Sequence, residues 1–449
     1  MGKLFGTDGI RGKANEYPMT TETALRVGRA VAMRFGTSGG LTKIIVGRDT
    51  RLSGDMFEAA IVAGICSAGA DAGLAGVIPT PAVAFLTSTL KADAGIVISA
   101  SHNPFYDNGI KIFGADGFKL SDETEAHIEE LVLDDAVDQR ARPTGIVYRL
   151  DDALDANRTF LKNTWPQDRS IEGLKLVLDC ANGATYRVAP ALFSELGAGV
   201  SALGVSPDGR NINDHCGSEH TAGLIQEVVA RGADVGLAFD GDGDRLIAVD
   251  ETGEILSGDQ ILAICANAMH RNGTLENHVV VSTVMSNMGL GAALKDMQIT
   301  HEIAGVGDRY VVQKMIACGA VLGGEDSGHM IFLKDHTTGD GILTALKLLE
   351  AMQSEHKPLS VLRRIMTVYP QVLMNVEVHS KPEIESLTDL EAAIKKVESE
   401  LAGQGRVLVR YSGTQPLCRV MVEGPDEEIT RQYCIQLSDI IAKNIGSGG

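Results

Sequence analysis

Basic residues, aromatic side chains and closely spaced cysteines are all scarce in this sequence of 449 residues. Lys and Arg together number 40, and Asp and Glu number 59, so the net charge is −19 at pH 7. A chain this acidic is a poor candidate for general binding to nucleic acid or to an anionic membrane. Aromatic residues make up only 4%, which argues against an aromatic stacking surface. A phosphate ligand would need a few basic residues gathered locally to hold it.

The cysteines and the apolar segments bear on the cellular compartment. The seven cysteines occur singly between Cys66 and Cys434, and no two have the Cys-x-x-Cys spacing. This pattern indicates neither a zinc site nor a disulfide framework, and it favours reduced thiols. The first twelve residues lack the apolar segment of a secretory signal. The uncharged stretch 72–90 contains two prolines and is interpreted as a strand, a turn and a buried helix. We therefore expect a cytoplasmic protein without a membrane segment.

Two nucleotide-binding patterns are absent. The sequence contains no G-x-G-x-x-G, and its one Gly-Lys pair near a candidate loop, in RGKA at 11–14, lacks the other residues of a Walker A motif. Nucleotide-dependent kinases and dehydrogenases therefore have no support.

Three segments of the chain follow one plan. Each has a short β-branched run, then an Ala- and Leu-rich stretch of helical period, then a second apolar run that ends in a Gly-rich polar loop. The second runs with their loops are residues 92–104, 232–245 and 318–329. Strands that alternate with helices predict parallel βαβ units, in which ligands bind at the loops after the carboxyl ends of the strands. The segment 369–449 lacks this alternation and predicts a small α+β domain.

These patterns predict an α/β fold in four domains. Three similar α/β domains have parallel or mixed sheets, and the C-terminal α+β domain is smaller. The predicted ranges are 1–155, 156–256, 257–368 and 369–449.

The motif DGDGDR brings three carboxylates together. Asp240, Asp242 and Asp244 follow the apolar run VGLAF, and three carboxylates this close repel unless a cation neutralises them. Hard oxygen ligands suit Mg²⁺ or Ca²⁺. An EF-hand is excluded because Arg245 stands where its loop needs glycine. A solvated acidic turn and a phosphatase that uses Asp240 as its nucleophile stay open.

Three further loops carry polar groups suited to a phosphorylated sugar. In SASHNP, Ser101 follows the strand-like GIVIS, and a phosphoryl-carrying serine beside a metal site suits it better than a serine activated by the adjacent His102. A turn serine that caps the next segment is the alternative. GGEDSGH offers Glu325, Ser327 and His329. RYSGTQPLCR offers two arginines and two hydroxyls around a glycine, a favourable phosphate cradle.

The motifs together resemble one family. FGTDGIRG, SASHNP, DGDGDR, GEDSGH and RYSGTQP occur in the order found in α-D-phosphohexomutases, and the resemblance covers essentially the whole chain. The opening motif, VGDRYV and TTGDG resemble the branch that acts on glucosamine phosphates. The resemblance implies three similar α/β domains and a smaller C-terminal domain around one central cleft.

The resemblance also implies a reaction. Ser101 carries a phosphoryl group and passes it to O1 of glucosamine 6-phosphate. The resulting glucosamine 1,6-bisphosphate reorients and returns its 6-phosphoryl group to Ser101, and glucosamine 1-phosphate leaves for cell-wall precursor synthesis. A kinase or a bisphosphate donor would prime Ser101, and a homodimer is a candidate assembly.

The family's site residues carry over position by position. One Mg²⁺ per subunit would be held by Ser101 and the three aspartates, Asp240, Asp242 and Asp244. The candidates for proton transfer are Lys111 and His329, with Arg11 and Arg245 at the same site. The sugar-hydroxyl contacts are Glu325 and Ser327. The distal phosphate site comprises Arg410, Ser412, Gly413, Thr414 and Arg419.

This sequence departs from the family pattern at Tyr411, Gln415 and Asp326, which bear on the phosphate loop and on the charge near the sugar. A mutase of phosphomannose or phosphoglucose, a metal-dependent phosphatase and a non-enzymatic phosphosugar-binding protein remain the competing functions.

Overall fold

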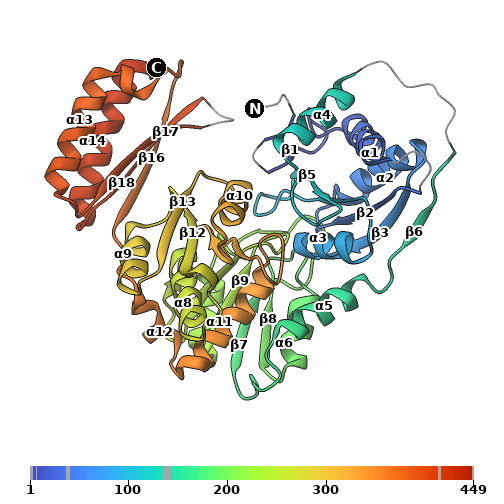
Figure 1. Ribbon diagram of the computed structural model, residues 1–449, viewed down its shortest axis with the longest axis horizontal. Coiled ribbons are helices and arrows are strands. Elements are labelled where there is room, and N and C mark those ends of the chain that lie inside the picture. The colour runs from blue at the N-terminus through green and yellow to red at the C-terminus, as the bar shows by residue number, and fades with distance from the viewer. Residues whose placement is uncertain (1–3, 7, 37–40, 135–142, 413–415, 447–449) are drawn as a thin grey trace. The chain divides into compact units, whose positions relative to one another are not determined.

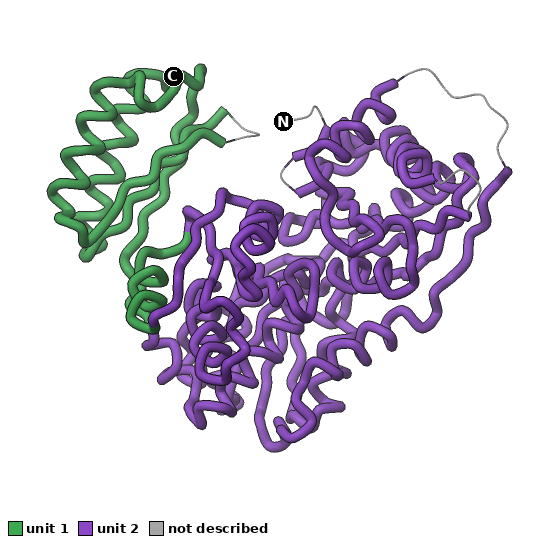
Figure 2. The backbone as a smooth tube through the Cα atoms, viewed as in Figure 1, with its two compact units in different colours: residues 1, 286–297, 366–449 green, residues 2–285, 298–365 purple. Residues whose placement is uncertain are grey.

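The computed structural model describes residues 4–6, 8–36, 41–134, 143–412 and 416–446. These residues pack into two compact units, shown in different colours in Figure 2. The larger unit comprises 2–285 and 298–365, and the smaller one comprises 286–297 and 366–449. Within the described residues, no helix has the length and apolarity needed to cross a membrane.

The larger unit contains three sheets (Figure 1). The first has the order β1-β5-β4-β2-β3-β6, with β1 (Ile10–Lys13), β2 (Lys43–Arg48), β3 (Asp71–Val77), β4 (Ala94–Ile98), β5 (Asp107–Gly114) and β6 (Val147–Arg149). The second has the order β11-β10-β9-β7-β8, with β7 (Lys175–Asp179), β8 (Gly199–Leu203), β9 (Val235–Phe239), β10 (Leu246–Asp250) and β11 (Ile255–Leu256). The third has the order β13-β12-β14-β15, with β12 (Val279–Thr283), β13 (Thr300–Ala304), β14 (Leu322–Gly324) and β15 (Met330–Phe332).

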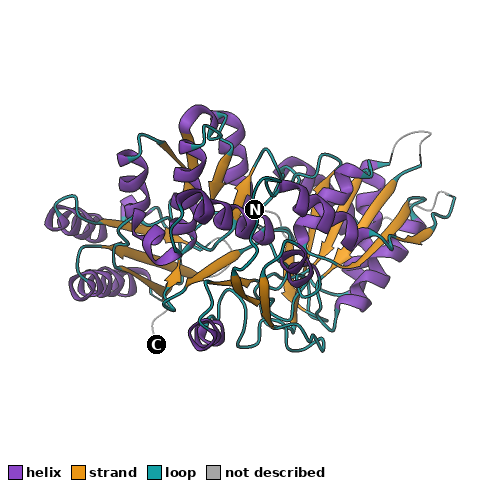
Figure 3. Cartoon of the chain, turned by 90° about the horizontal axis from the view of Figure 1, so that it is seen from below, coloured by secondary structure: helices purple, strands orange, loops and turns teal. Residues whose placement is uncertain are grey.

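The helices of the larger unit flank these sheets, as Figure 3 shows. They are α1 (Thr21–Phe35), α2 (Gly54–Ser67), α3 (Thr80–Thr89), α4 (Asp122–Leu133), α5 (Ala153–Thr164), α6 (Val188–Glu195), α7 (Ala222–Arg231), α8 (Gly258–Arg271), α10 (Asp308–Cys318), α11 (Gly341–Glu355) and α12 (Leu359–Leu362). Short 3₁₀ turns occupy Glu276–His278 and Arg363–Ile365.

The first sheet is buried on both faces. Successive apolar residues of its central strand, β2, point alternately to the two faces and pack into a different core on each. In β2, Ile44 and Val46 pack into the core beneath α1 and α2. Ile45, between them, points to the opposite core, which includes residues of α3. This is the continuous apolar pattern that parallel strands covered on both faces require.

One hairpin recurs in all three sheets. A parallel core, β2, β3 and β4 in the first sheet, is extended by an antiparallel strand, β5. The second sheet repeats this with β9 and β10, and the third with β14 and β15. The turns of these hairpins are SASHNP, DGDGDR and GEDSGH. The sequence therefore located the three loops at the correct strand ends, but the strand that follows each of them is antiparallel and makes the sheets mixed.

The smaller unit combines the elements predicted for the C-terminal α+β domain with α9 (Met288–Asp296), which lies in the range predicted for the third domain. Its antiparallel sheet has the order β16-β18-β17, with β16 (Gln371–Glu377), β17 (Arg406–Tyr411) and β18 (Leu417–Glu423). Its helices are α9, α13 (Thr388–Leu401) and α14 (Glu427–Ile445), with a 3₁₀ turn at Ile384–Ser386. Val420 and Val422 of β18 pack with Leu437 and Ile441 of α14 in its core. The predicted fold class is confirmed.

Candidate active site

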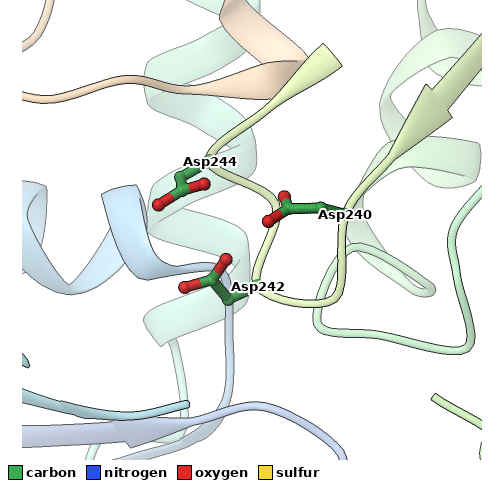
Figure 4. Close-up of side chains that lie close together, drawn as sticks. All are labelled: Asp240, Asp242 and Asp244. Atoms are coloured by element: carbon green, nitrogen blue, oxygen red, sulfur yellow. The ribbon is translucent and has the colours of Figure 1, made fainter. Parts of the chain in front are cut away.

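The three aspartates of DGDGDR converge in space. Their side chains turn toward one region in Figure 4, and one carboxylate oxygen from each lies within 4.8 Å of the other two. Asp240, Asp242 and Asp244 are all buried. Gly243 allows this curl because its φ of 75° lies in the left-handed region that glycine adopts without strain.

The charges of the cluster are strongly perturbed. Burial raises the pKa of Asp240 well above its usual range, and the negative charges of Asp244 and Asp242 raise it further. Burial also acts against ionisation of Asp244, but Lys111 and His329 outweigh it and hold the pKa of Asp244 well below its usual value. Among the described residues, Oδ1 of Asp242 is buried without a hydrogen-bond partner. Unpartnered carboxylate oxygens around one point are the donor set that a hard divalent cation needs.

Ser101 lies against this cluster. Its Oγ donates a hydrogen bond of 2.5 Å to Oδ2 of Asp240, and its side chain is buried. Its φ is 52°, an unfavourable value for a residue other than glycine, and such strain is common where a turn presents a reactive group. The structure thus brings the predicted serine and the predicted metal ligands together.

Arg51 fixes the serine turn, and the sequence analysis did not identify it. Its guanidinium is fully buried, pairs with Asp49 at 2.8 Å, and donates to the carbonyl oxygens of Ser101 and Asn103 at 2.8 Å. Asn213, from the loop before α7, donates to the same two carbonyl oxygens at 2.9 and 3.0 Å. The turn is therefore held through its backbone, and these contacts do not involve the Ser101 hydroxyl. The one sequence signal for this role is the position of Arg51, three residues after the apolar strand β2, in the segment GRDTR.

Lys111, on β5, enters the cluster from the first sheet. Its Nζ lies 2.8 Å from Asp242 and 3.1 Å from Asp244, with the side chain buried. Burial alone would lower the pKa of Lys111, but the carboxylates of Asp242 and Asp244 raise it well above its usual value. Thr80, at the start of α3, donates to the same Asp242 oxygen at 2.6 Å.

His329 lies between two carboxylates. Its Nδ1 is 3.6 Å from Asp244, and its Nε2 is 3.4 Å from Asp308. The backbone N–H of Gly339 also donates to Nε2 at 3.2 Å, and this contact favours the neutral ring. The two carboxylates have a larger effect and favour the protonated ring. Although burial opposes it, the net effect raises the pKa of His329 to about 10.

Two arginines give the site a positive side. The backbone N–H of Arg245 donates to Asp240 at 3.1 Å, and its guanidinium Nε lies 3.9 Å from Asp244. Arg11 pairs with Asp8, and its Nη1 reaches to 3.5 Å from the carbonyl oxygen of Ala100. Burial and these two guanidinium groups lower the pKa of His102 to about 4, so this ring is neutral at pH 7.

The GEDSGH turn carries the two residues that were predicted to contact the sugar. Glu325 is half-buried and accepts a 3.0 Å hydrogen bond from the N–H of Gly307. Within the described part of the chain, the Ser327 hydroxyl oxygen is buried without a hydrogen-bond partner. A buried hydroxyl of this kind is available to a polar ligand.

The TTGDG motif supports His329 and Arg245. A Cβ added to Gly339 would lie 2.4 to 2.6 Å from three atoms of the His329 ring, and one added to Gly341 would lie 2.3 Å from the Arg245 carbonyl oxygen. Asp340, between them, caps α11 by accepting from the N–H groups of Ile342 and Leu343 at 2.8 and 3.0 Å.

We expect Gly339→Ala to lower turnover by about ten- to a hundredfold, because the new methyl group must displace the His329 imidazole from its two carboxylates. The melting temperature should fall by only a few degrees, as for a moderate overpacking. Steady-state kinetics and thermal melting measure the two effects. Gly223→Ala is the matched control, since a Cβ there meets nothing within 4 Å. Equal turnover of the two variants would show that the imidazole need not be held in place.

The predicted phosphate residues of the smaller unit also lie together. Arg410 on β17 is directly opposite Arg419 on β18, so the two side chains share a face of the sheet. Burial and the charge of Arg419 lower the pKa of Arg410. Ser412 is buried, and its carbonyl oxygen accepts from Lys381 at 2.6 Å. Gly413 and Thr414 lie outside the described residues.

The site of the larger unit can bind a divalent cation beside a serine hydroxyl, with an ammonium, an imidazolium and two guanidinium groups around them. This combination suits transfer of a phosphoryl group, which needs charge stabilisation on the moving group and a partner for one proton.

Comparison with known proteins agrees with this chemistry. The chain matches the models of all four domains of the phosphoglucomutase/phosphomannomutase family: α/β/α domain I at 2–137, domain II at 158–253, domain III at 257–369 and the C-terminal domain at 373–440. It is 60% identical to a phosphoglucosamine mutase of Syntrophus aciditrophicus, over 99% of this chain and 100% of that protein. It is 57% identical to one of Syntrophobacter fumaroxidans, with the same coverage.

Two solved structures have a similar fold. A phosphoglucomutase/phosphomannomutase family protein from Burkholderia thailandensis has a TM-score of 0.79 at 24% identity, with 98% of each chain covered. An N-acetylphosphoglucosamine mutase from Aspergillus fumigatus, solved in complex with GlcNAc-6P and magnesium, has a TM-score of 0.68 at 17% identity. That match covers 98% of this chain and 95% of the fungal one. From the four matched domains and these full-length relatives, we conclude that the chain belongs to the phosphoglucomutase/phosphomannomutase family of mutases, within the group of bacterial phosphoglucosamine mutases.

Proposed function

We propose that this mutase interconverts glucosamine 6-phosphate and glucosamine 1-phosphate, with Ser101 as the carrier of the phosphoryl group. The observation that carries the proposal is the buried Ser101 hydroxyl, 2.5 Å from a carboxylate of a three-aspartate cluster. The choice of sugar rests on the bacterial relatives, which match along the whole chain and are named phosphoglucosamine mutases.

We assign Mg²⁺, one ion per subunit, to Asp240, Asp242, Asp244 and an oxygen of phosphorylated Ser101. The buried, unpartnered Oδ1 of Asp242 and the oxygen-only donor set support this choice. When bound, the ion offsets negative charge on the transferring phosphoryl group.

The reaction would occur in two transfers. In the first, the bond between Ser101 Oγ and phosphorus breaks, a bond from phosphorus to O1 of the sugar forms, and the O1 proton passes to a protein base. Glucosamine 1,6-bisphosphate then reorients, and its 6-phosphoryl group passes to Ser101 while the sugar O6 takes up a proton. Lys111 and His329 are the candidates for the two proton transfers, since both lie beside Asp244 in the same buried cluster. In the protonated form that these carboxylates favour, either could give a proton to O6, whereas the group that takes the O1 proton must first lose its own.

The remaining predicted residues would bind the substrate. Arg245 and the catalytic residue Arg11 would face phosphate oxygens near Ser101, and Glu325 and Ser327 would bind sugar hydroxyls. The phosphate that is not reacting would be held by Arg410, Ser412, Gly413, Thr414 and Arg419. The predicted domain ranges, a cytoplasmic location, a homodimer, and priming of Ser101 by a kinase or a bisphosphate donor belong to the same proposal.

The test is a comparison of sugar phosphates on protein phosphorylated at Ser101, with Mg²⁺ present. Phosphorus NMR should show glucosamine 6-phosphate converting to glucosamine 1-phosphate, with a higher kcat/KM than glucose 6-phosphate or mannose 6-phosphate. A higher kcat/KM for either of those would instead assign the phosphoglucomutase or phosphomannomutase activity. Steady release of inorganic phosphate would indicate a phosphatase.

A further inference from the structure

Five buried or nearly buried side chains and the partly exposed Asp8 form a closed ring of alternating charge in the larger unit. Around the ring, each group contacts the next: Asp8, Lys119, Asp308, His329, Asp244 and Lys111. The sequence analysis singled out only three of these, namely Lys111, Asp244 and His329. The other three, which we call the outer arc, are Asp8, Lys119 and Asp308.

The outer arc has close contacts. Lys119, in the loop after β5, pairs with Asp8 and lies 2.6 Å from Asp308. Asp8 in turn lies 3.3 Å from the ammonium of Lys111. Asp308 and Lys119 keep only 9% and 10% of their side-chain surface exposed, so little water screens these charges.

The carboxylate of Asp308 is fixed at both oxygens. Its Oδ1 accepts from the N–H of Arg309 at 2.8 Å, at the first turn of α10. Its Oδ2 faces both the Lys119 ammonium and, at 3.4 Å, Nε2 of His329. Arg309 extends the contact by pairing with Asp122 and Glu125 of α4. The VGDRYV segment, at the start of α10, is thus tied to α4 and to the loop after β5 at the point where it meets the imidazole.

We propose that Asp308 and Lys119 are positioning residues for the proposed mutase reaction: Asp308 fixes the orientation of the His329 ring, and Lys119 holds Asp308 against it. A buried ion pair contributes little net stability compared with apolar packing, so stability alone does not account for this arrangement. A fixed orientation matters for proton transfer, because the imidazole must meet the reacting oxygen at hydrogen-bond distance. This inference rests on the proposed function only for its kinetic consequence.

The kinetic test uses three variants and one control. Asp308→Asn keeps the size of the side chain but removes its charge, and Lys119→Met removes the charge that holds it. Each should lower kcat by about ten- to a hundredfold and change KM for glucosamine 6-phosphate by less than about threefold. Lys119→Arg, which restores the charge, should recover most of kcat. Lys314→Met, on an exposed lysine of α10 paired with Glu302 at 2.7 Å, should match wild type.

A second measurement needs no substrate. In protein labelled with ¹⁵N-histidine, with the His329 signal assigned from a His329→Gln variant, Asp308→Asn should shift the His329 ring nitrogens and speed the exchange of its N–H with water. The same signals should be unchanged in Lys314→Met. Thermal melting should show that Lys119→Met is folded. Its comparison with Lys119→Arg then keeps the test valid if Asp308→Asn is unstable.

The outcomes separate this inference from the proposed function. Unchanged His329 signals in Asp308→Asn, or loss of activity entirely through KM, would overturn the positioning role. Shifted signals in a protein that is inactive on glucosamine phosphates would support the positioning role and refute the proposed substrate.

Discussion

Replacement of Ser101 by alanine is expected to lower mutase turnover by at least about a thousandfold, because loss of a group that forms the covalent intermediate removes the reaction path itself. The fold should survive. The turn is held by Arg51 and Asn213 through the backbone carbonyl of Ser101, which alanine retains. Alanine also tolerates a φ of 52° about as well as serine does. Turnover and thermal melting together measure the effect.

Mass spectrometry provides the decisive comparison for this variant. Intact wild-type protein should carry a phosphoryl adduct that the alanine variant lacks. Ser88→Ala, at an exposed serine of α3, is the control and should keep both the adduct and the activity. Substantial turnover in the Ser101 variant would exclude a phosphoserine intermediate.

Asp242→Asn should lower the affinity for Mg²⁺ by at least about tenfold, since even outer-shell groups of a metal site have effects of that size. Asparagine has nearly the same shape and can still accept from Thr80 and Lys111, so the loss follows from the missing charge. Phosphoryl transfer should fall with occupancy, and excess Mg²⁺ should restore part of it. Calorimetric titration of the metal into the chelator-treated protein measures the affinity.

The control for this variant is Asp335→Asn, which removes a partly exposed carboxylate paired with Lys347 at 2.9 Å. It should leave both Mg²⁺ affinity and turnover unchanged. An unaltered titration curve would remove Asp242 from the ligand set.

Local sequence was sufficient to predict the elements that carry the site. The apolar runs before Ser101 and Asp240 are β4 and β9, and the strand–helix–strand–strand–helix order of residues 369–449 is the observed order. These predictions succeeded because a strand that is covered on both faces has a run of consecutive apolar residues. Both β4 and β9 are of this kind, and every residue in them is buried. The polar turns were conspicuous because they interrupt such runs with charged residues and glycine.

The outer part of the site could not be predicted in the same way. Arg51 and Lys119 lie in no motif to which a role was assigned, and Asp308 was quoted only as part of VGDRYV. Each acts on a residue that is distant along the chain. Lys119 and Asp308, for example, are separated by 189 positions and meet only because α10 begins beside the loop after β5. The residues next to a charged side chain do not show whether that side chain is buried in an ion pair or exposed to solvent. The prediction of parallel or mixed sheets was correct, but it did not assign the antiparallel direction to β5, β10 and β15. Alternation of strands and helices does not determine the direction of a strand joined by a tight turn.

Because the hairpin recurs in three sheets, enzymatic activity should respond to loss of packing between the sheets before the secondary structure changes. Ser101, Asp240 and His329 lie in the hairpin turns of three different sheets, so the reacting groups meet only when all three sheets are docked. Mild denaturant or acid that loosens packing between sheets would leave each hairpin and its far-ultraviolet circular dichroism intact. Activity would nevertheless vanish, because a displacement of about 1 Å is enough to disrupt alignment of reacting groups. Enzyme assays should therefore detect partial unfolding of this protein at denaturant concentrations where its spectrum is still native.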